Sequence, residues 1–224
     1  MVIVGQFEAA REFFTGTTKA LVASGEIGDR EVTANFLLSH KGVVAVDGGL
    51  VHCHVLGITP ELIVGDLDSI PQDLLKVYSH VRTVFFPVEK DETDLELALE
   101  LVFQGDVQRA YVYGALGGRL DHLLGNVILL TRYPGKVFLE TEGELAFVVN
   151  RTTELSCQKG QTVSLIPFNG KVEGISTVGL KWELEKASMH KNFLGISNQC
   201  TSNKFSVTVE KGDLLCCLNK KPVG

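Results

Sequence analysis

The sequence has no uninterrupted apolar stretch long enough to cross a bilayer, so a membrane-spanning protein is not expected. The apolar start, residues 1–5, is too short for the hydrophobic core of a signal peptide, and Glu8 and Arg11 soon follow it. Internal repeats and low-complexity segments are also missing. These absences predict a globular, cytoplasmic protein with no membrane partner.

Basic residues are in the minority, because 21 Lys and Arg stand against 27 Asp and Glu and the formal net charge is −6. No nucleic-acid partner bound through a basic face is therefore expected. A nucleotide substrate is compatible with this charge, because a bound metal reverses the local sign. The five cysteines are odd in number and form no CxxC pair, which predicts reduced thiols rather than disulfides or a zinc site.

In the first half of the chain, short β-branched runs that end near Gly, Asp or Pro alternate with amphipathic stretches. The predicted strands are residues 43–46, 61–64, 81–86 and 110–113, and the predicted helices are residues 71–79, 93–104 and 121–132. Unbroken apolar strands between helices predict a parallel sheet covered on both faces. Residues 6–30 fit neither pattern and are interpreted as an extra helix or a surface loop.

The second half changes character from about Glu144 onward, where we find strand patterns and turns but no helix. Apolar residues alternate with polar ones at Leu180, Trp182 and Leu184, and glycines punctuate the runs. This spacing predicts a small antiparallel sandwich. The predicted domains are therefore residues 1–142, of α/β type, and residues 143–224, of all-β type.

Acidic or glycine-rich clusters follow several predicted strands. In an open α/β sheet, ligands bind outside the carboxyl ends of the strands, so these clusters are expected to converge on one edge. The clusters are Asp47-Gly48-Gly49, Gly65-Asp66-Leu67-Asp68-Ser69, Lys90-Asp91-Glu92-Thr93-Asp94 and Gly114-Ala115-Leu116-Gly117-Gly118-Arg119-Leu120-Asp121-His122. Taken alone, the first is more simply interpreted as a turn between a strand and a helix.

Two of the clusters offer carboxylates for a hard cation. Asp66 and Asp68 lie two residues apart after an apolar run, a spacing that suits Mg²⁺. The alternative is helix capping by Asp68 or Ser69. In the next cluster Asp91 or Thr93 is a capping candidate, and Asp94 suits the first turn of a helix.

Cationic and glycine-rich positions suit an anion. Lys90 is either a solvated charge or a point charge that binds a phosphate. The guanidinium of Arg119 can donate two hydrogen bonds to the oxygens of one phosphate. Gly117 and Gly118 lead into a helix N-terminus in a pattern that is neither a Walker A loop nor GxGxxG. His122 is more simply a structural histidine than a base.

In this order, the segments DGG, GDLDS, KDETD and GALGGRLDH resemble the motifs of thiamine pyrophosphokinases. Residues 164–167, 177–182 and 195–198 resemble β-domain segments of the same family. The resemblance implies a Rossmann-like N-terminal domain, a C-terminal β-sandwich that binds thiamine and dimerises, and a homodimer. It also implies Mg²⁺ as cofactor and transfer of the diphosphoryl unit of ATP to the hydroxyl of thiamine, which gives thiamine diphosphate and AMP.

The resemblance also implies residue roles. Asp66, Asp68, Asp94 and Asp121 would form the catalytic acidic cluster, and the candidate metal ligands are Asp47, Asp66, Asp68, Asp91 and Asp94. The candidate ATP contacts are Asp47, Gly48, Gly49, Lys90, Thr93, Gly117, Gly118, Arg119 and His122, and the candidate thiamine contacts are Trp182, Ser197 and Asn198. No general base stands out, with Asp94 or Asp121 as candidates.

Three alternatives stay open. By its spacing alone, Trp182 is a core residue in register with Leu180 and Leu184. A metal-dependent phosphohydrolase would use the same acidic edge with water as the nucleophile. A non-catalytic nucleotide or thiamine binder would be stabilised by ligand without turnover.

Overall fold

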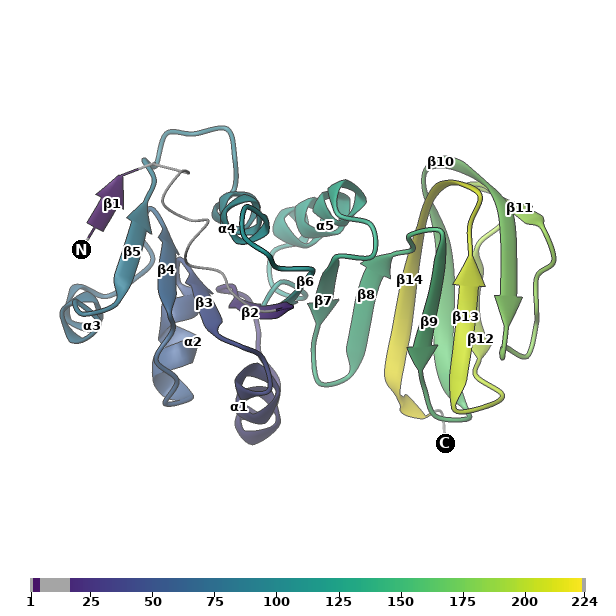
Figure 1. Cartoon of the computed structure of the whole chain (residues 1–224), viewed down its shortest axis with the longest axis horizontal. Coiled ribbons are helices and arrows are strands. Elements are labelled where there is room, and N and C mark those ends of the chain that lie inside the picture. The colour runs from purple at the N-terminus through teal and green to yellow at the C-terminus, as the bar shows by residue number, and fades with distance from the viewer. Residues whose placement is uncertain (1, 5–16, 223–224) are drawn as a thin grey trace. The chain divides into compact units, whose positions relative to one another are not determined.

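The protein is described by a computed structural model that covers residues 2–4 and 17–222 (Figure 1). The chain divides into two compact units. The first comprises Met1–Asn126 with Leu139–Thr141, and the second comprises Val127–Phe138 with Glu142–Gly224. None of the helices in the described part of the chain is long and apolar enough to cross a membrane.

The first unit contains parallel strands in the order β1-β5-β4-β3-β2-β6. Their bounds are β1 (Val2–Val4), β2 (Thr18–Val22), β3 (Val43–Val46), β4 (Leu62–Gly65), β5 (Arg82–Phe85) and β6 (Arg109–Tyr113). The chain runs from β2 outward through β3, β4 and β5, and then returns to place β6 on the other side of β2. The strand order therefore reverses between β2 and β6, and such a switch point leaves a crevice at the carboxyl ends.

Helices lie on both faces of this sheet (Figure 1). The first three, α1 (Arg30–Leu38), α2 (Gly49–Val55) and α3 (Gln72–Val77), share one buried core with β2, β3 and β4. Helix α4 (Asp94–Phe103) covers the opposite face and buries Leu95, Leu97, Ala98, Leu99, Leu101 and Val102. The prediction of a parallel sheet covered on both faces is therefore confirmed.

Strand β2 corrects the interpretation of residues 6–30 as a helix or a surface loop. Residues 18–22 form an interior strand between β3 and β6, whereas residues 6–16 lie outside the described part of the chain. The strand was not predicted because a lysine interrupts its apolar residues. Lys19 is 2% exposed, and its Nζ lies 2.7 Å from a carboxylate oxygen of Glu61. A buried lysine needs such a partner, which is 42 residues away in the chain.

Helix α5 (Leu120–Leu129) and a 3₁₀ turn (Leu130–Arg132) follow β6, and β7 (Val137–Glu140) precedes the strands of the second unit. Those strands pair antiparallel. Their bounds are β8 (Glu144–Val148), β9 (Thr152–Ser156), β10 (Gln161–Val178), β11 (Ala187–Met189), β12 (Gly195–Gln199), β13 (Lys204–Thr208) and β14 (Lys211–Pro222). As predicted, residues 144–222 contain no helix.

The long strand β10 organises the second unit. Its first part pairs with β12 and its last part pairs with β11 and β13, while its pairing with β14 shifts in register between Phe168 and Glu173. The predicted strand through Leu180, Trp182 and Leu184 is wrong. Leu180 makes a single bridge to Cys200, and the residues after it are irregular.

Candidate active site

A cleft of about 730 Å³ opens in the first unit at the carboxyl ends of β2, β3, β4, β5 and β6. The loops that follow these strands and the first turns of α4 and α5 supply its walls. The predicted site residues that line it are Asp47, Asp66, Asp68, Lys90, Thr93, Asp94, Gly117, Gly118, Arg119, Asp121 and His122. The expected convergence of distant clusters on one edge of the sheet is therefore present.

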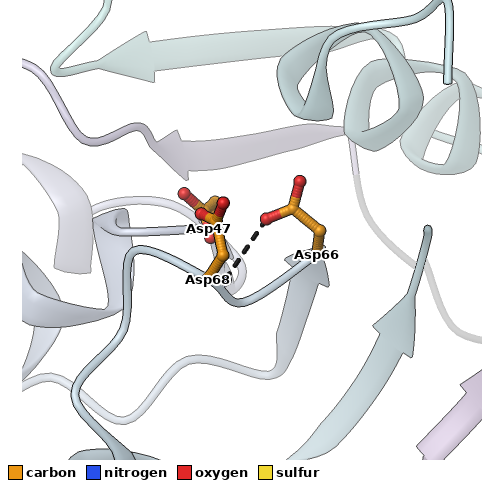
Figure 2. Close-up of side chains that lie close together, drawn as sticks. All are labelled: Asp47, Asp66 and Asp68. Carbon is orange, nitrogen blue, oxygen red and sulfur yellow. Dashed lines mark hydrogen bonds between the residues drawn. The ribbon is translucent and has the colours of Figure 1, made fainter. Parts of the chain in front are cut away.

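Three aspartates form the acidic centre of this cleft. Asp47, Asp66 and Asp68 each offer a carboxylate oxygen, and these oxygens all lie within 4.8 Å of one another (Figure 2). Oδ1 of Asp47 is buried and has no hydrogen-bond partner among the described residues. A buried carboxylate oxygen without a partner is costly, and a cation would compensate it. Oxygen donors are what Mg²⁺ prefers, so this set fits a magnesium ion.

The backbone around these aspartates takes an uncommon conformation. Asp47 has φ of 45° and Leu67 has φ of 65°, although neither is glycine. Such positions cost about 1 kcal/mol or more and persist where the surrounding structure holds them. The Leu67 side chain packs against the core of the first unit. This anchoring leaves the carboxylates of Asp66 and Asp68 on the cleft, with the Asp68 amide donating to Asp66 Oδ1 at 3.2 Å.

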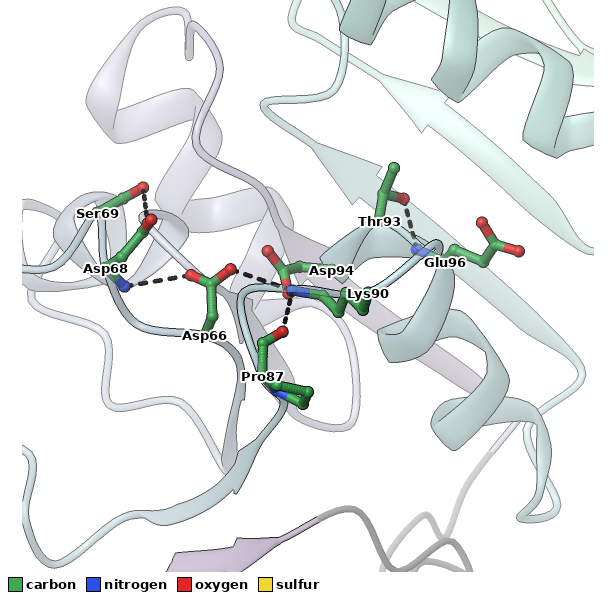
Figure 3. A network of polar contacts seen from close by, with 8 residues as sticks. All are labelled: Asp66, Asp68, Ser69, Pro87, Lys90, Thr93, Asp94 and Glu96. Atoms are coloured by element: carbon green, nitrogen blue, oxygen red, sulfur yellow. Dashed lines mark hydrogen bonds and ion pairs between the residues drawn. The ribbon is translucent and has the colours of Figure 1, made fainter.

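Lys90 joins two of the acidic segments (Figure 3). Its Nζ lies 3.0 Å from Asp66 Oδ2 and 3.1 Å from Asp94 Oδ1, and it also donates to the carbonyl oxygen of Pro87 at 3.0 Å. The Lys90 side chain is 11% exposed, so the alternative of a solvated charge is wrong. Lys90 carries the positive charge between the strand β4 and helix α4 segments of the cleft.

The environment separates the pKa values of the two carboxyls that Lys90 contacts. Burial raises the pKa of Asp94 above its usual value, and the charges of Asp66 and Asp47 add to this effect against the hydrogen bond from Lys90. Burial acts in the same direction on Asp66, but hydrogen bonds from Lys90 and from the Asp68 amide hold its pKa below the usual value. Asp66 is therefore the more firmly ionised of the two, and Asp94 is the better proton acceptor.

The glycine-rich segment before α5 forms another wall of the cleft. Gly117 and Gly118 have φ of 88° and 72°, a region that glycine enters without strain. The Arg119 guanidinium forks onto Asp121, with Nη2–Oδ2 at 2.6 Å and Nε–Oδ1 at 3.1 Å. This contact, with the His122 amide, lowers the pKa of Asp121 to about 2. Asp121 lines the cleft but is not a member of the Asp47, Asp66 and Asp68 group.

Helix capping accounts for some of these residues. Thr93 is the N-cap of α4 and accepts from the Glu96 amide at 3.2 Å, as the capping alternative predicted. Capping by Asp68 or Ser69 is wrong, because Pro71 occupies the N-cap of α3 and the Ser69 hydroxyl donates to Asp68 instead.

Three of the residues predicted to contact the metal or ATP do not line the cleft. Asp91 is exposed, and of the two alternatives at this segment only Asp94 lines the cleft. Gly48 and Gly49 lie where α2 begins against β2. A Cβ on Gly49 would lie 1.8 Å from the carbonyl oxygen of Val22, so this glycine permits close packing of helix on strand. Neither glycine is among the residues that line the cleft, although a Cβ on Gly48 would lie 3.0 Å from the Cβ of Ser24, which does line it.

The sequence interpretation missed the loop after β2. Ser24 and Gly25 line the cleft, and the Gly25 amide donates to the carbonyl oxygen of Gly114 at 2.9 Å. A Cβ on Gly25 would lie 2.4 Å from that same oxygen, so the loops after β2 and β6 touch through glycines. An apolar run followed by Ser-Gly repeats the pattern seen at the other strands and would have identified this loop.

In the second unit the predicted thiamine-contact residues lie together. The Trp182 amide donates to Asn198 Oδ1 at 3.1 Å, and Asn198 Nδ2 donates to the Trp182 carbonyl oxygen at 2.7 Å. Ser197 precedes Asn198 on β12 and has φ of 62°. Trp182 is 56% exposed, so its interpretation as a core residue is wrong. Lys181 Nζ lies 4.6 Å from the centre of its ring, which is a cation–π contact.

Comparison with known proteins identifies the family. The model of the thiamin pyrophosphokinase catalytic domain matches residues 33–139, and that of the thiamin pyrophosphokinase vitamin B1 binding domain matches residues 149–214. Thiamine pyrophosphokinase 2 of Arabidopsis thaliana is 30% identical over 180 residues, which cover 74% of this chain and 67% of the relative. The thiamine pyrophosphokinase of Bacillus subtilis is 28% identical over 189 residues, which cover 79% and 86%.

Solved structures share the fold. The crystal structure of thiamine pyrophosphokinase from Bacillus subtilis superposes with a TM-score of 0.80 at 23% identity and covers 92% of this chain and 100% of that one. Thiamin pyrophosphokinase from Candida albicans superposes with a TM-score of 0.76 at 18% identity and covers 94% and 91%. With both domain models matched in order along the chain, the protein belongs to the thiamine pyrophosphokinase family.

Proposed function

We propose that this chain transfers the diphosphoryl group of ATP to the hydroxyl of thiamine and releases thiamine diphosphate and AMP. The family supports the reaction. The observation that carries the assignment to this cleft is the group of Asp47, Asp66 and Asp68 beside the Lys90 ion pairs. Carboxylates for a metal and cations for anionic oxygens are the parts that phosphoryl transfer requires.

The two halves of the chain would bind different substrates. Residues 1–142 would form a Rossmann-like domain that binds ATP and Mg²⁺, and residues 143–224 a β-sandwich that binds thiamine and dimerises. The reversal of strand order between β2 and β6 supports the first assignment. The antiparallel pairing around β10 and the cluster of Trp182 with Asn198 support the second.

Asp47, Asp66 and Asp68 would hold the magnesium ion, with Asp94 rather than Asp91 next to them. When bound, the ion would neutralise charge on the phosphate oxygens and favour attack at phosphorus. Lys90 and Arg119 would contact further phosphate oxygens, Arg119 through the guanidinium N–H groups that Asp121 does not hold. Thr93, Gly117, Gly118 and His122 line the same cleft and would complete the contacts to ATP.

Asp94 is the proposed acceptor of the proton that the thiamine hydroxyl loses. Burial raises the pKa of Asp94, whereas hydrogen bonds lower that of Asp66, so Asp94 holds a proton better than Asp66. The competing candidate, Asp121, is exposed, and its contact with Arg119 lowers its pKa to about 2. A carboxyl that is so readily ionised is a weak base, and its proposed part in catalysis is to orient Arg119.

His52 is expected to hold the loop after β2 in position at the cleft. Its Nε2 lies 2.7 Å from the carbonyl oxygen of Gly25, in the loop that lines the cleft after β2. His52→Leu removes this contact and should raise KM for ATP about fivefold, because one hydrogen bond contributes about 1 kcal/mol. Steady-state kinetics with ATP as the varied substrate tests this. His52→Gln keeps an N–H donor and should restore KM; equal KM values for the His52→Leu and wild-type proteins would contradict the role.

Trp182 gives a direct probe of thiamine binding, because it is the only tryptophan in the chain. Its exposed ring is the proposed contact for the cationic ring of thiamine, with Ser197 and Asn198 beside it. Saturating thiamine is therefore expected to change the intrinsic fluorescence. An unchanged emission spectrum at concentrations that support turnover would remove Trp182 from the thiamine site.

The protein is proposed to be a homodimer. In addition to residues 143–224, helix α5 is a proposed part of the interface, because its Leu120, Leu124 and Ile128 repeat at intervals of four residues and are 68%, 51% and 51% exposed. Such a stripe is costly in water and suits an interface. Leu124→Glu is expected to shift the protein from dimer to monomer in light scattering. A wild-type protein that is monomeric at all concentrations tested would refute the proposal.

The function itself is tested by incubating the purified protein with ATP, Mg²⁺ and thiamine and identifying the products by mass. AMP and thiamine diphosphate in equal amounts, formed only when thiamine is present, are the expected result. Release of phosphate without thiamine would favour the metal-dependent phosphohydrolase. Ligand-dependent stabilisation without any product would favour the non-catalytic binder.

A further inference from the structure

Ser24 lies in the loop that follows β2, at the point where the strand order of the sheet reverses. Hydrogen bonds to the segment that ends β6 fix the backbone on either side of it. The Ala23 amide donates to the carbonyl oxygen of Tyr113 at 2.8 Å. The Gly25 amide donates to the carbonyl oxygen of Gly114 at 2.9 Å. Ser24 is therefore held in the crevice where an open α/β sheet binds its ligands.

Ser24 has two hydrogen-bond donors that the described part of the chain does not use. Neither its amide nor its hydroxyl has a protein partner there. The residue is exposed and lines the cleft, so both groups are left to water or to a ligand. The ammonium group of Lys90, by contrast, is already paired with Asp66 and Asp94. Ser24 therefore adds neutral donors to a cleft whose charged side chains are largely paired with one another.

Gly48 separates Ser24 from the segments that carry the acidic group. A Cβ on Gly48 would lie 3.0 Å from the Cβ of Ser24 and 3.4 Å from the Cβ of Ser69. Gly48 directly follows Asp47, and the Ser69 hydroxyl donates to Asp68 Oδ1 at 3.0 Å. The backbone of Gly48 is right-handed, with φ of −55° and ψ of −11°, so its conformation does not require glycine. What requires glycine is the narrow space between the two serine side chains.

We propose that Ser24 is a further contact for ATP, in which its hydroxyl and amide donate to phosphate oxygens beside the acidic group, and that Gly48 keeps Ser24 in position for this contact. The inference rests on the proposed function, because ATP is its substrate. Carboxylates repel a phosphate chain wherever no metal lies between them, whereas a hydroxyl and a backbone N–H form strong hydrogen bonds to anionic oxygens. The Ser24 donors adjoin the carboxylates that would hold the metal, so they suit the oxygens that the metal leaves free.

Calorimetric titration of the full-length protein with α,β-methylene-ATP and Mg²⁺, without thiamine, measures this contact. The analogue cannot be cleaved between its α and β phosphorus atoms, so binding is separated from turnover. Ser24→Ala removes the hydroxyl and keeps the amide, and should raise Kd about tenfold, the size expected for one hydrogen bond to a charged group. Ser79→Ala is the matched control, because Ser79 is also exposed but does not line the cleft, and its Kd should equal that of the wild type.

Gly48→Ala tests the role of the space beside Ser24. The new methyl group should displace the exposed Ser24 and raise Kd about threefold, because a misaligned hydrogen bond is weakened rather than lost. The Tm should stay near that of the wild type, since an exposed side chain can move aside. Ser24→Gly removes both the hydroxyl and the Cβ that the methyl group would meet. Adding Gly48→Ala to Ser24→Gly should therefore leave Kd unchanged.

The outcomes separate this contact from the proposed function. Equal Kd values for the wild type and the Ser24→Ala protein would overturn the contact with ATP. A threefold effect of Gly48→Ala that persists in the Ser24→Gly background would overturn the role of Gly48. If Kd depended on Ser24 but the wild-type protein formed no thiamine diphosphate from ATP and thiamine, the proposed function would be refuted and the contact with ATP supported.

Discussion

Asp66→Asn is expected to lower kcat/KM by about 10³-fold, equivalent to about 4 kcal/mol of transition-state stabilisation. The substitution keeps the size of the side chain but removes the negative charge of Asp66. That charge is part of the acidic group with Asp47 and Asp68 and forms the ion pair with Lys90. The fold should survive, because Lys90 retains its contact with Asp94 at 3.1 Å. Removing one of three neighbouring carboxylates also reduces their mutual repulsion.

Rates measured across a magnesium titration test this prediction, with the Tm of each variant as the measure of folding. The half-saturating magnesium concentration should rise for Asp66→Asn, while its Tm stays near that of the wild type. Asp73→Asn is the matched control, since Asp73 is 96% exposed, does not line the cleft and forms an ion pair with Lys76. If both variants showed wild-type rates and magnesium dependence, Asp66 would not be a metal ligand.

Gly49→Ala is expected to destabilise the protein by about 3 kcal/mol, which is large for the addition of one methyl group. The new Cβ would lie 1.8 Å from the carbonyl oxygen of Val22, a backbone atom of an interior strand. Neither strand β2 nor helix α2 can move easily, because β2 pairs with β3 and β6 while α2 packs into the buried core. Helix α2 would have to move away from the sheet.

Urea denaturation at equilibrium measures this loss of stability. Gly125→Ala is the matched control, because Gly125 is also helical and a Cβ there would meet nothing within 4 Å. The control should be stabilised by about 0.5–1 kcal/mol, the usual gain from alanine in a helix. A Gly49→Ala protein as stable as the wild type would show that α2 adjusts its position freely.

The strands that the sequence predicted are those with uninterrupted apolar character, such as Val43–Val46 and Leu62–Gly65. Strand β2 was missed because its charged residue, Lys19, is compensated by Glu61 from a distant segment. No local pattern reveals such a partner. The segment after Leu180 shows the opposite error, because a strand was predicted where the structure has none. Its alternation suits a strand, but the Trp182 amide bonds to the Asn198 side chain rather than to a neighbouring strand.

The positions of site residues were predictable where the direction of the strands alone determines them. Residues at the carboxyl ends of parallel strands must meet at one edge, and Asp47, Asp66 and Asp68 do. The finer assignments depend on contacts that spacing does not reveal. Arg119 engages Asp121 two residues along the chain, and Gly49 packs on Val22 rather than facing the cleft. The burial that raises the pKa of Asp94 likewise comes from tertiary packing.

The return of β6 to the side of β2 has a consequence for how the enzyme acquires its active form. Ala20 pairs with Tyr111, and the loop-closure cost of so long-range a contact favours its forming after the local elements between the two residues. Until then Gly25 and Gly114 are apart, and a partly folded chain has no cleft for the nucleotide. The ligand would therefore stabilise only molecules that have completed the β2–β6 pairing. Protection from proteolysis by magnesium and ATP would then report the end of folding during refolding or synthesis.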